Sequence, residues 1–212
     1  VASAHTERVG DIAGVARAKA ELVQALPSSG FAILNADDER VREMRMQTDA
    51  QVLTYGSHTS SDICMTKCNL DEMARASVSA KTPWGEVTWA MSAPGAHMAH
   101  NAAAAIAVAG VCGVSIENAA AALESSALSP MRMQILTTDT GLTVINDAYN
   151  ANPTSMRAAI DALVAIKAAR HVVIAGQMAE LANSDAEHVQ IREYAVSRSI
   201  EFRSEEHTSE LQ

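Results

Sequence analysis

The stretch from Thr143 to Met156 (TVINDAYNANPTSM) places the strongest constraint on how this chain folds. Its β-branched start, Thr143 to Ile145, predicts a buried strand, and the polar run that follows has no regular period. Asn152 is a favoured N-cap, and Pro153 is favoured at the first helical position. The stretch therefore predicts a strand, a polar loop and a helix N-terminus, an arrangement that binds ligands in open α/β sheets. An ordinary βα loop with capping residues accounts for the pattern equally well.

Helical and strand patterns alternate along the rest of the chain. Helices are expected at 11–26, 39–48, from about 97 to 111, 115–123, 153–166 and 186–197, strands at 31–34, 51–55 and 170–175, and a hairpin at 76–91. This alternation predicts an α/β fold with parallel units. Periodicity stops at 125–130, which predicts a linker. We expect one domain over 1–127 and a second, truncated domain over 128–202.

Charge and cysteine content exclude several classes of protein. The net charge of −9 argues against a general nucleic-acid surface. No apolar run reaches about 18 residues, so we expect no membrane helix. Cys64 and Cys68 lack a second Cys or His pair at zinc spacing, which favours free thiols in a reducing cytoplasm. We expect a cytoplasmic monomer.

Both ends of the sequence are unusual. The chain begins without Met, which suggests that it starts inside a longer protein. The last ten residues, 203–212 (RSEEHTSELQ), interrupt the preceding pattern and resemble the translation of a common sequencing-adapter oligonucleotide. We interpret these ten residues as an artefact and leave them out of the predicted fold.

Lys19 stands out in the first predicted helix. It lies near the middle of the apolar face, between Val15 and Leu22. An unpaired buried ammonium is costly, so two interpretations are open. Either the side chain snorkels at the edge of the core, or its amine is kept neutral and used in chemistry.

Seven motifs, taken together and in order, resemble those of the Mur ligase family, the ATP-dependent ligases of peptidoglycan synthesis. They are Ala4-His5, Ala16 to Leu22, Leu34 to Asp38, Gly95-x-His97-x-x-x-Asn101, Arg132-Met133, Asn146 to Pro153, and Gly176-x-Met178-x-Glu180-Leu181 with His188. The most specific are N-D-A-Y-N-A-N-P and G-x-M-x-E-L. The resemblance covers Val1 to about Phe202, and it implies roughly half of such an enzyme.

The resemblance implies an α/β protein in two parts. These are the later part of a central, P-loop-type ATPase domain and a truncated, Rossmann-like C-terminal domain. The implied reaction is amide formation, in which ATP activates a carboxylate as an acyl phosphate that an amine then attacks. Within the family the motifs are most similar to the enzymes that join D-alanyl-D-alanine to a UDP-N-acetylmuramoyl-tripeptide. ATP and Mg²⁺ are the implied cofactors.

The same resemblance assigns roles to individual residues. Lys19 matches a lysine that is carbamylated and helps to hold magnesium, and His5 matches a metal-ligand histidine. His97 and Asn101 match residues near the adenine of the bound nucleotide. Arg132 and Asp147 match nucleotide contacts from the C-terminal domain. On that side of the cleft, the resemblance implies that the shape is set by Tyr149, Asn150 and Asn152. Capping of the Ala-rich helix is a simpler role for His97 and Asn101.

Several features depart from the family pattern. Met98, Met131 and Gln177 replace an asparagine, a glycine and an aspartate. No G-x-x-G-K-[ST] phosphate loop occurs, so we expect this chain alone not to turn over ATP. A Mur-type ligase with another acceptor, or a non-catalytic nucleotide-binding protein derived from a ligase, remains an alternative. A plain dinucleotide-binding domain is disfavoured because no G-x-G-x-x-G follows a strand.

Overall fold

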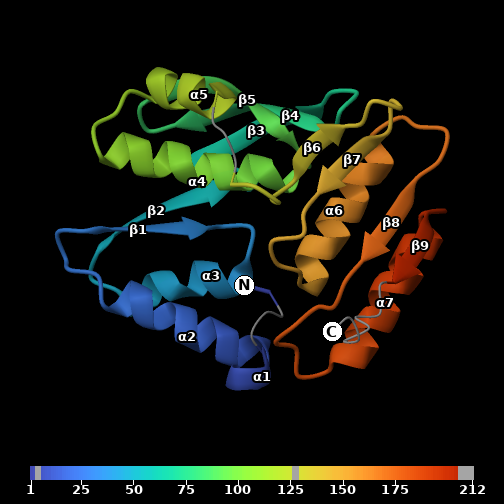
Figure 1. Ribbon diagram of the computed structural model, residues 1–212. Coiled ribbons are helices and arrows are strands. Elements are labelled where there is room, and N and C mark those ends of the chain that lie inside the picture. The colour runs from blue at the N-terminus through green and yellow to red at the C-terminus, as the bar shows by residue number, and fades with distance from the viewer. Residues whose placement is uncertain (3–5, 126–128, 205–212) are drawn as a thin grey trace.

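The computed structural model describes residues 1–2, 6–125 and 129–204. The elements of the first part gather around one sheet, and those of the second part lie beside them (Figure 1). The predicted α/β fold class is confirmed. The predicted boundary at 127/128 and half of the predicted linker (126–128) lie outside the described residues.

The first part holds most of the regular structure. Its elements are α1 (Thr6–Val9), α2 (Ile12–Gln24), β1 (Phe31–Asn35), α3 (Glu39–Glu43), the 3-10 helix η1 (Met44–Gln47), β2 (Gln51–Gly56), β3 (Ile63–Leu70), β4 (Arg75–Thr82), β5 (Gly85–Pro94), α4 (His97–Val111) and α5 (Ile116–Ser125). Aspartates begin two of the helices: Asp11 accepts the Gly14 N–H at 2.7 Å, and Asp38 accepts the Val41 N–H at 3.2 Å.

The five strands form one sheet in the order β1-β2-β3-β4-β5. The first three run parallel, whereas β3, β4 and β5 are antiparallel neighbours. The predicted hairpin is confirmed, with Pro83 and Trp84 between β4 and β5. The sequence prediction missed β3, which it treated as a polar stretch. Only Ile63 and Met65 are buried there, and the exposed second half of the strand carries no apolar pattern.

The main core lies between this sheet and α4. Ile63, Val78 and Ile106 are fully buried in it. The alanines of α4 that face the sheet are also buried, so the helix backbone can approach the strands closely. A smaller cluster joins α2 to β1 through Val23, Leu34 and neighbouring residues.

The second part contains two small sheets. Its elements are β6 (Gln134–Thr137), β7 (Thr143–Asn146), α6 (Pro153–Ala165), β8 (Val172–Ala175), α7 (Ser184–Ser197) and β9 (Glu201–Ser204). β6 and β7 pair antiparallel, while β8 and β9 pair parallel across α7. Arg203 and Ser204, the first residues of the predicted artefact, lie in β9, and 205–212 fall outside the described residues.

The strand–loop–helix arrangement predicted from 143–156 is confirmed. Asn152 accepts the N–H groups of Thr154 and Ser155, and the Ser155 hydroxyl lies 3.1 Å from the Asn152 N–H, which completes a capping box. The predicted burial of the strand is wrong, because Val144 is 36% exposed. β7 belongs to a two-stranded hairpin, and β-branched residues suit an exposed strand as well as a buried one.

The two parts share one core. Met133 and Ala162 belong to the same buried cluster as the side chains between α4 and the sheet. Ile145 and Ala159 pack against that cluster. None of the helices in the described ranges has the length and apolar character needed to cross a bilayer.

We predict that Ile106→Ala lowers the free energy of unfolding by about 2–5 kcal/mol, because it leaves a cavity in the main core. Val108, on the same helix, is 48% exposed and provides the matched control. Val108→Ala is expected to change stability by less than about 0.5 kcal/mol. Urea unfolding of the three proteins measures the difference, and equal losses for the two variants would contradict this view of α4.

Candidate functional site

His97 begins α4 at the boundary between the two parts of the chain. Gly95, just before it, has φ +103°, and a Cβ there would lie 2.5 Å from His97 Cε1 and 3.6 Å from the Ala162 Cβ. The backbone conformation and the close approach of the imidazole therefore favour glycine here, whereas the distance to α6 is an ordinary contact. His97 is half-buried.

Asp147 faces His97 from the loop after β7. Its Oδ1 accepts the Met133 N–H at 2.9 Å, which ties this loop to the residues before β6. Burial raises the pKa of Asp147, against the Met133 hydrogen bond and the positive charges of His97 and Arg132. Burial likewise lowers the pKa of His97, against the attraction of Asp147. Desolvation thus outweighs mutual attraction in both groups.

Arg132 lies on the same side of the boundary as Asp147. Its guanidinium stacks 4.1 Å from the centre of the Tyr149 ring, and the Tyr149 N–H donates to the Met131 carbonyl at 3.1 Å. Both Arg132 and Tyr149 are exposed. The structure therefore offers an orientated cation beside a half-buried carboxylate, a combination suited to phosphate and hydroxyl groups.

The backbone on either side of Arg132 is strained. Met131 has φ +60° and Met133 has φ +47°, values in the left-handed region that side chains with a Cβ adopt at a cost. Met131 is also the position at which the sequence resemblance implies a glycine. A glycine would adopt this conformation without strain.

The structure brings four of the predicted site residues together: His97, Arg132, Asp147 and Tyr149. Asn101 lies one turn along α4 from His97, where it is exposed and its Nδ2 is 3.7 Å from Met98 Sδ. Asn150 is exposed in the loop before α6. The predicted site residue His5 lies outside the described residues.

The expected position of Lys19 is wrong. Lys19 is exposed on α2, and Leu22, its supposed neighbour on the apolar face, is 73% exposed. The buried residues of α2 are Val15, Ala20 and Val23, with Gly14, so the face in contact with the core is rotated away from Lys19. The burial that was expected to keep its amine neutral is therefore missing from this structure.

Asp37 and His100 form a polar cluster that the sequence prediction did not assign to the site. The Asp37 carboxylate accepts the Ser57 N–H at 2.8 Å, the His58 N–H at 3.1 Å and the His100 Nε2–H at 3.0 Å. Burial opposes its charge, but these donors outweigh burial and lower the pKa of Asp37. A Cβ on Gly56 would lie 2.6 Å from Asp37 Oδ1, so glycine makes room for the carboxylate.

This cluster extends the site onto the sheet. Asp37 follows β1 and Ser57 follows β2, so both lie at the carboxyl ends of parallel strands. His100, one turn along α4 from His97, is close enough to lower the pKa of His97 by charge repulsion. The rule that ligands bind beyond the carboxyl ends of strands could have identified Asp37 from the sequence.

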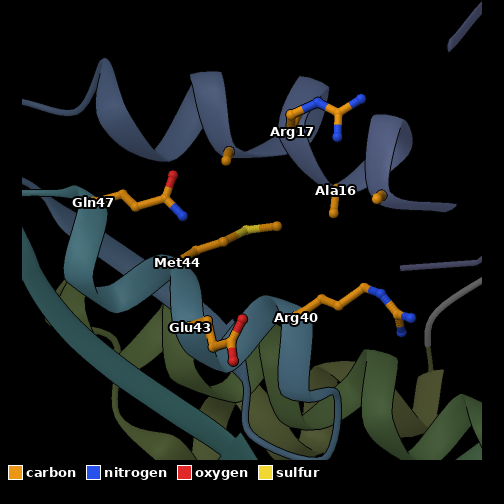
Figure 2. Close-up of a pocket in the computed structure, with 8 residues that line it drawn as sticks. Ala16, Arg17, Arg40, Glu43, Met44 and Gln47 are labelled. Carbon is orange, nitrogen blue, oxygen red and sulfur yellow. The ribbon is translucent and has the colours of Figure 1, made fainter. Parts of the chain in front are cut away.

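A separate cavity lies between α2 and the α3–η1 segment (Figure 2). It measures about 300 Å³ and is lined by Ala13, Ala16, Arg17, Ala20, Arg40, Glu43, Met44 and Gln47. None of the predicted site residues that the structure describes lines it. In the described part of the chain, no three His, Cys, Asp or Glu side chains are grouped so that they could hold a metal ion.

Comparison with known families identifies both parts of the chain. Residues 1–109 match the Mur ligase middle domain, and residues 131–210 match the family described as Mur ligase, glutamate ligase domain. The chain therefore belongs to the Mur ligase family. The cluster of His97, Arg132, Asp147 and Tyr149 accordingly combines a residue from the middle domain with three from the C-terminal domain.

Individual relatives show which members of the family the chain is similar to. The chain is 40% identical over 207 residues to the UDP-N-acetylmuramoyl-tripeptide–D-alanyl-D-alanine ligase of Mycobacterium tuberculosis, covering 94% of this chain and 41% of that protein. It is 32% identical over 203 residues to the Escherichia coli ligase of the same name, covering 95% of this chain and 45% of that protein. The chain thus spans less than half the length of these relatives.

Solved structures show the same fold. The crystal structure of MurF from Acinetobacter baumannii superimposes with a TM-score of 0.85 at 27% identity, covering 96% of this chain and 48% of that one. MurF ligase from Thermotoga maritima in complex with ADP gives a TM-score of 0.79 at 22% identity, covering 92% and 44%. The predicted pair of domain types is therefore confirmed.

We predict that the stabilising effect of Asp37 is lost in acid. Because its pKa in the folded state is below the ordinary value of 3.8, its contribution is fully present above that value and disappears as the pH falls through the folded pKa. Unfolding by urea at about pH 6 should show Asp37→Asn less stable than the parent chain, with a smaller difference at about pH 3.

The control for this pH dependence is Asp139→Asn, at an exposed aspartate in the turn between β6 and β7. The difference in free energy of unfolding between Asp139→Asn and the parent chain should not become smaller between about pH 6 and about pH 3. A constant difference for Asp37→Asn at both pH values would contradict the proposed role of the carboxylate.

Proposed function

We propose that the enzyme to which this chain belongs joins D-alanyl-D-alanine to a UDP-N-acetylmuramoyl-tripeptide, with ATP as the energy source. The observation that carries the proposal is the convergence of His97, Arg132 and Asp147 at the boundary between a Mur ligase middle domain and C-terminal domain. The acceptor is inferred from the names of the relatives at 40% and 32% identity. The reaction belongs to peptidoglycan synthesis.

The side chains present suit a bound nucleotide. The exposed guanidinium of Arg132, orientated by Tyr149, would pair with phosphate oxygens. The Asp147 carboxylate would accept hydrogen bonds from the ribose hydroxyls. Asn101 offers an amide that would hydrogen-bond to the adenine from α4, and Asn150 would line the opposite side. Bound ATP would supply the phosphoryl group that activates the substrate carboxylate for attack by the amine.

Magnesium is the second proposed cofactor. A carbamate on Lys19 would present two oxygen donors, which are the ligands that Mg²⁺ prefers. The exposed amine is accessible to carbon dioxide, although one side chain does not complete a site. We propose that Lys19 and His5 contribute ligands to a magnesium site. The remaining ligands of this site would come from outside the described residues.

We also propose that the enzyme works in the cytoplasm as a monomer. ATP is available there, and Cys64, Cys68 and Cys112 are all free thiols.

The substrate assignment predicts a specific acceptor. In the full-length parent protein, ATP-dependent phosphate release should require the UDP-N-acetylmuramoyl-tripeptide and should be supported by D-alanyl-D-alanine. Single amino acids, including L-alanine, should support little release, and the purified 212-residue chain should support none. Preference for a single amino acid would favour another ligase of the family, whereas no release under any condition would favour a non-catalytic protein.

We predict that Lys19→Ala in the full-length parent abolishes most of the activity, by about 100-fold or more, because a charge-stabilising group is lost. Activity should partly return when a small carboxylate is added, since it can replace the carbamate oxygens. Arg17→Ala, at an exposed position on the same helix, is the control and should retain activity. Full activity of Lys19→Ala would remove the proposed role.

A further inference from the structure

The two parts of the chain meet a second time, away from the cluster around His97. The Thr6 hydroxyl accepts the Ala182 N–H at 3.1 Å, and the Glu7 N–H donates to the Glu180 carbonyl at 3.2 Å. Thr6 is only 8% exposed, and with Ser61 it is one of few buried polar residues in the described part of the chain. In Figure 1, α1 lies beside the segment between β8 and α7, at the other end of the boundary from α4, β6 and β7.

The segment on the C-terminal side is held firmly. Met178 and Leu181 are buried in the core formed with α6 and α7, at 1% and 9% exposure. His188 Nε2 accepts the Met178 N–H at 2.9 Å, while its Nδ1 lies 2.7 Å from the Ser184 carbonyl oxygen. A carbonyl oxygen only accepts, so Nδ1 carries the hydrogen and the ring is a neutral tautomer. The segment therefore meets α1 as a preformed surface.

The backbone at the contact is strained. Glu180 has φ +63°, a left-handed conformation that is costly for a residue with a Cβ. In this conformation its carbonyl accepts the Glu7 N–H. Such strain persists only where the surroundings determine the conformation, and here the anchored neighbours and the hydrogen bond to α1 do so.

We propose that Thr6 is a positioning residue, and that the two hydrogen bonds from α1 to 180–182 form an interdomain latch. The shared core that contains Met133 and Ala162 attaches the domains at the end of their boundary near His97, and the latch attaches them at the other end. Two separated attachments resist rotation of one domain against the other, so the latch keeps Asp147 and Arg132 at their distance from α4. Its consequence for catalysis depends on the function proposed above, whereas its existence does not.

The latch is tested first on the 212-residue chain by amide hydrogen–deuterium exchange. Thr6→Val keeps the shape but removes the acceptor, so exchange at 178–182 should become about fivefold faster or more. Thr6→Ser should restore protection, and Thr143→Val, at an exposed strand position, should have no effect on it. Unchanged exchange in Thr6→Val would overturn the proposal, whatever the protein catalyses.

A second variant covers the case in which Thr6→Val fails to fold. Glu7→Pro removes the N–H that donates the other hydrogen bond of the latch, and proline is tolerated in the first turn of a helix. It should also accelerate exchange at 178–182, and protection equal to that of the parent chain would overturn the proposal.

The catalytic consequence is tested in the full-length enzyme by steady-state kinetics. Thr6→Val should raise the KM for ATP about fivefold, with a smaller change in kcat, and Thr6→Ser should return the KM to that of the parent. Faster exchange with an unchanged KM for ATP would show that the latch exists but does not position the site. This result would overturn the claim that Thr6 is a positioning residue. An inactive parent enzyme would instead contradict the proposed function and leave the exchange result standing.

Discussion

The close packing of α4 on the five-stranded sheet is the interaction on which the rest of the structure depends. Small side chains on the buried face let the helix approach the strands, and Ile106 fills the space that remains. The opposite side of the same helix carries His97, His100 and Asn101. Core packing therefore decides the position of these polar groups relative to the carboxyl ends of β1 and β2, and relative to the second domain.

The candidate site is a junction that neither domain builds alone. Asp37 holds His100 on the sheet side, whereas Asp147, with Arg132 near it, approaches His97 from the other side. Burial raises the pKa of Asp147 and lowers that of His97, so the neutral form of each group is favoured at this junction. Relative movement of the domains would rehydrate both groups. The chemistry of the site and the arrangement of the domains are therefore coupled.

Lys19 shows that a periodic sequence pattern can predict a helix without predicting which of its faces is buried. The helix was predicted correctly, because apolar residues recur at a period of 3.6 and Asp11 supplies a cap. The side of the helix that is covered depends on what packs there, and β1 and η1 bury Ala20 and Val23 while Lys19 and Leu22 remain exposed. The motif match gives Lys19 its proposed role, and burial in this chain adds nothing to it.

The sequence by itself determined the local elements and the family. Asn152 caps α6, and Thr82 to Gly85 form the turn of the hairpin, because these signals act within a few residues of one another. The two domain types were implied by the resemblance of the ordered motifs to a known family. Only the tertiary structure decided that β3 joins the sheet, that β7 is partly exposed, and that Asp37 meets His100. These outcomes depend on contacts between residues far apart in the chain, whose partners no local preference specifies. The contact between Thr6 and Ala182 shows this most clearly, since the two residues that meet lie 176 positions apart in the chain.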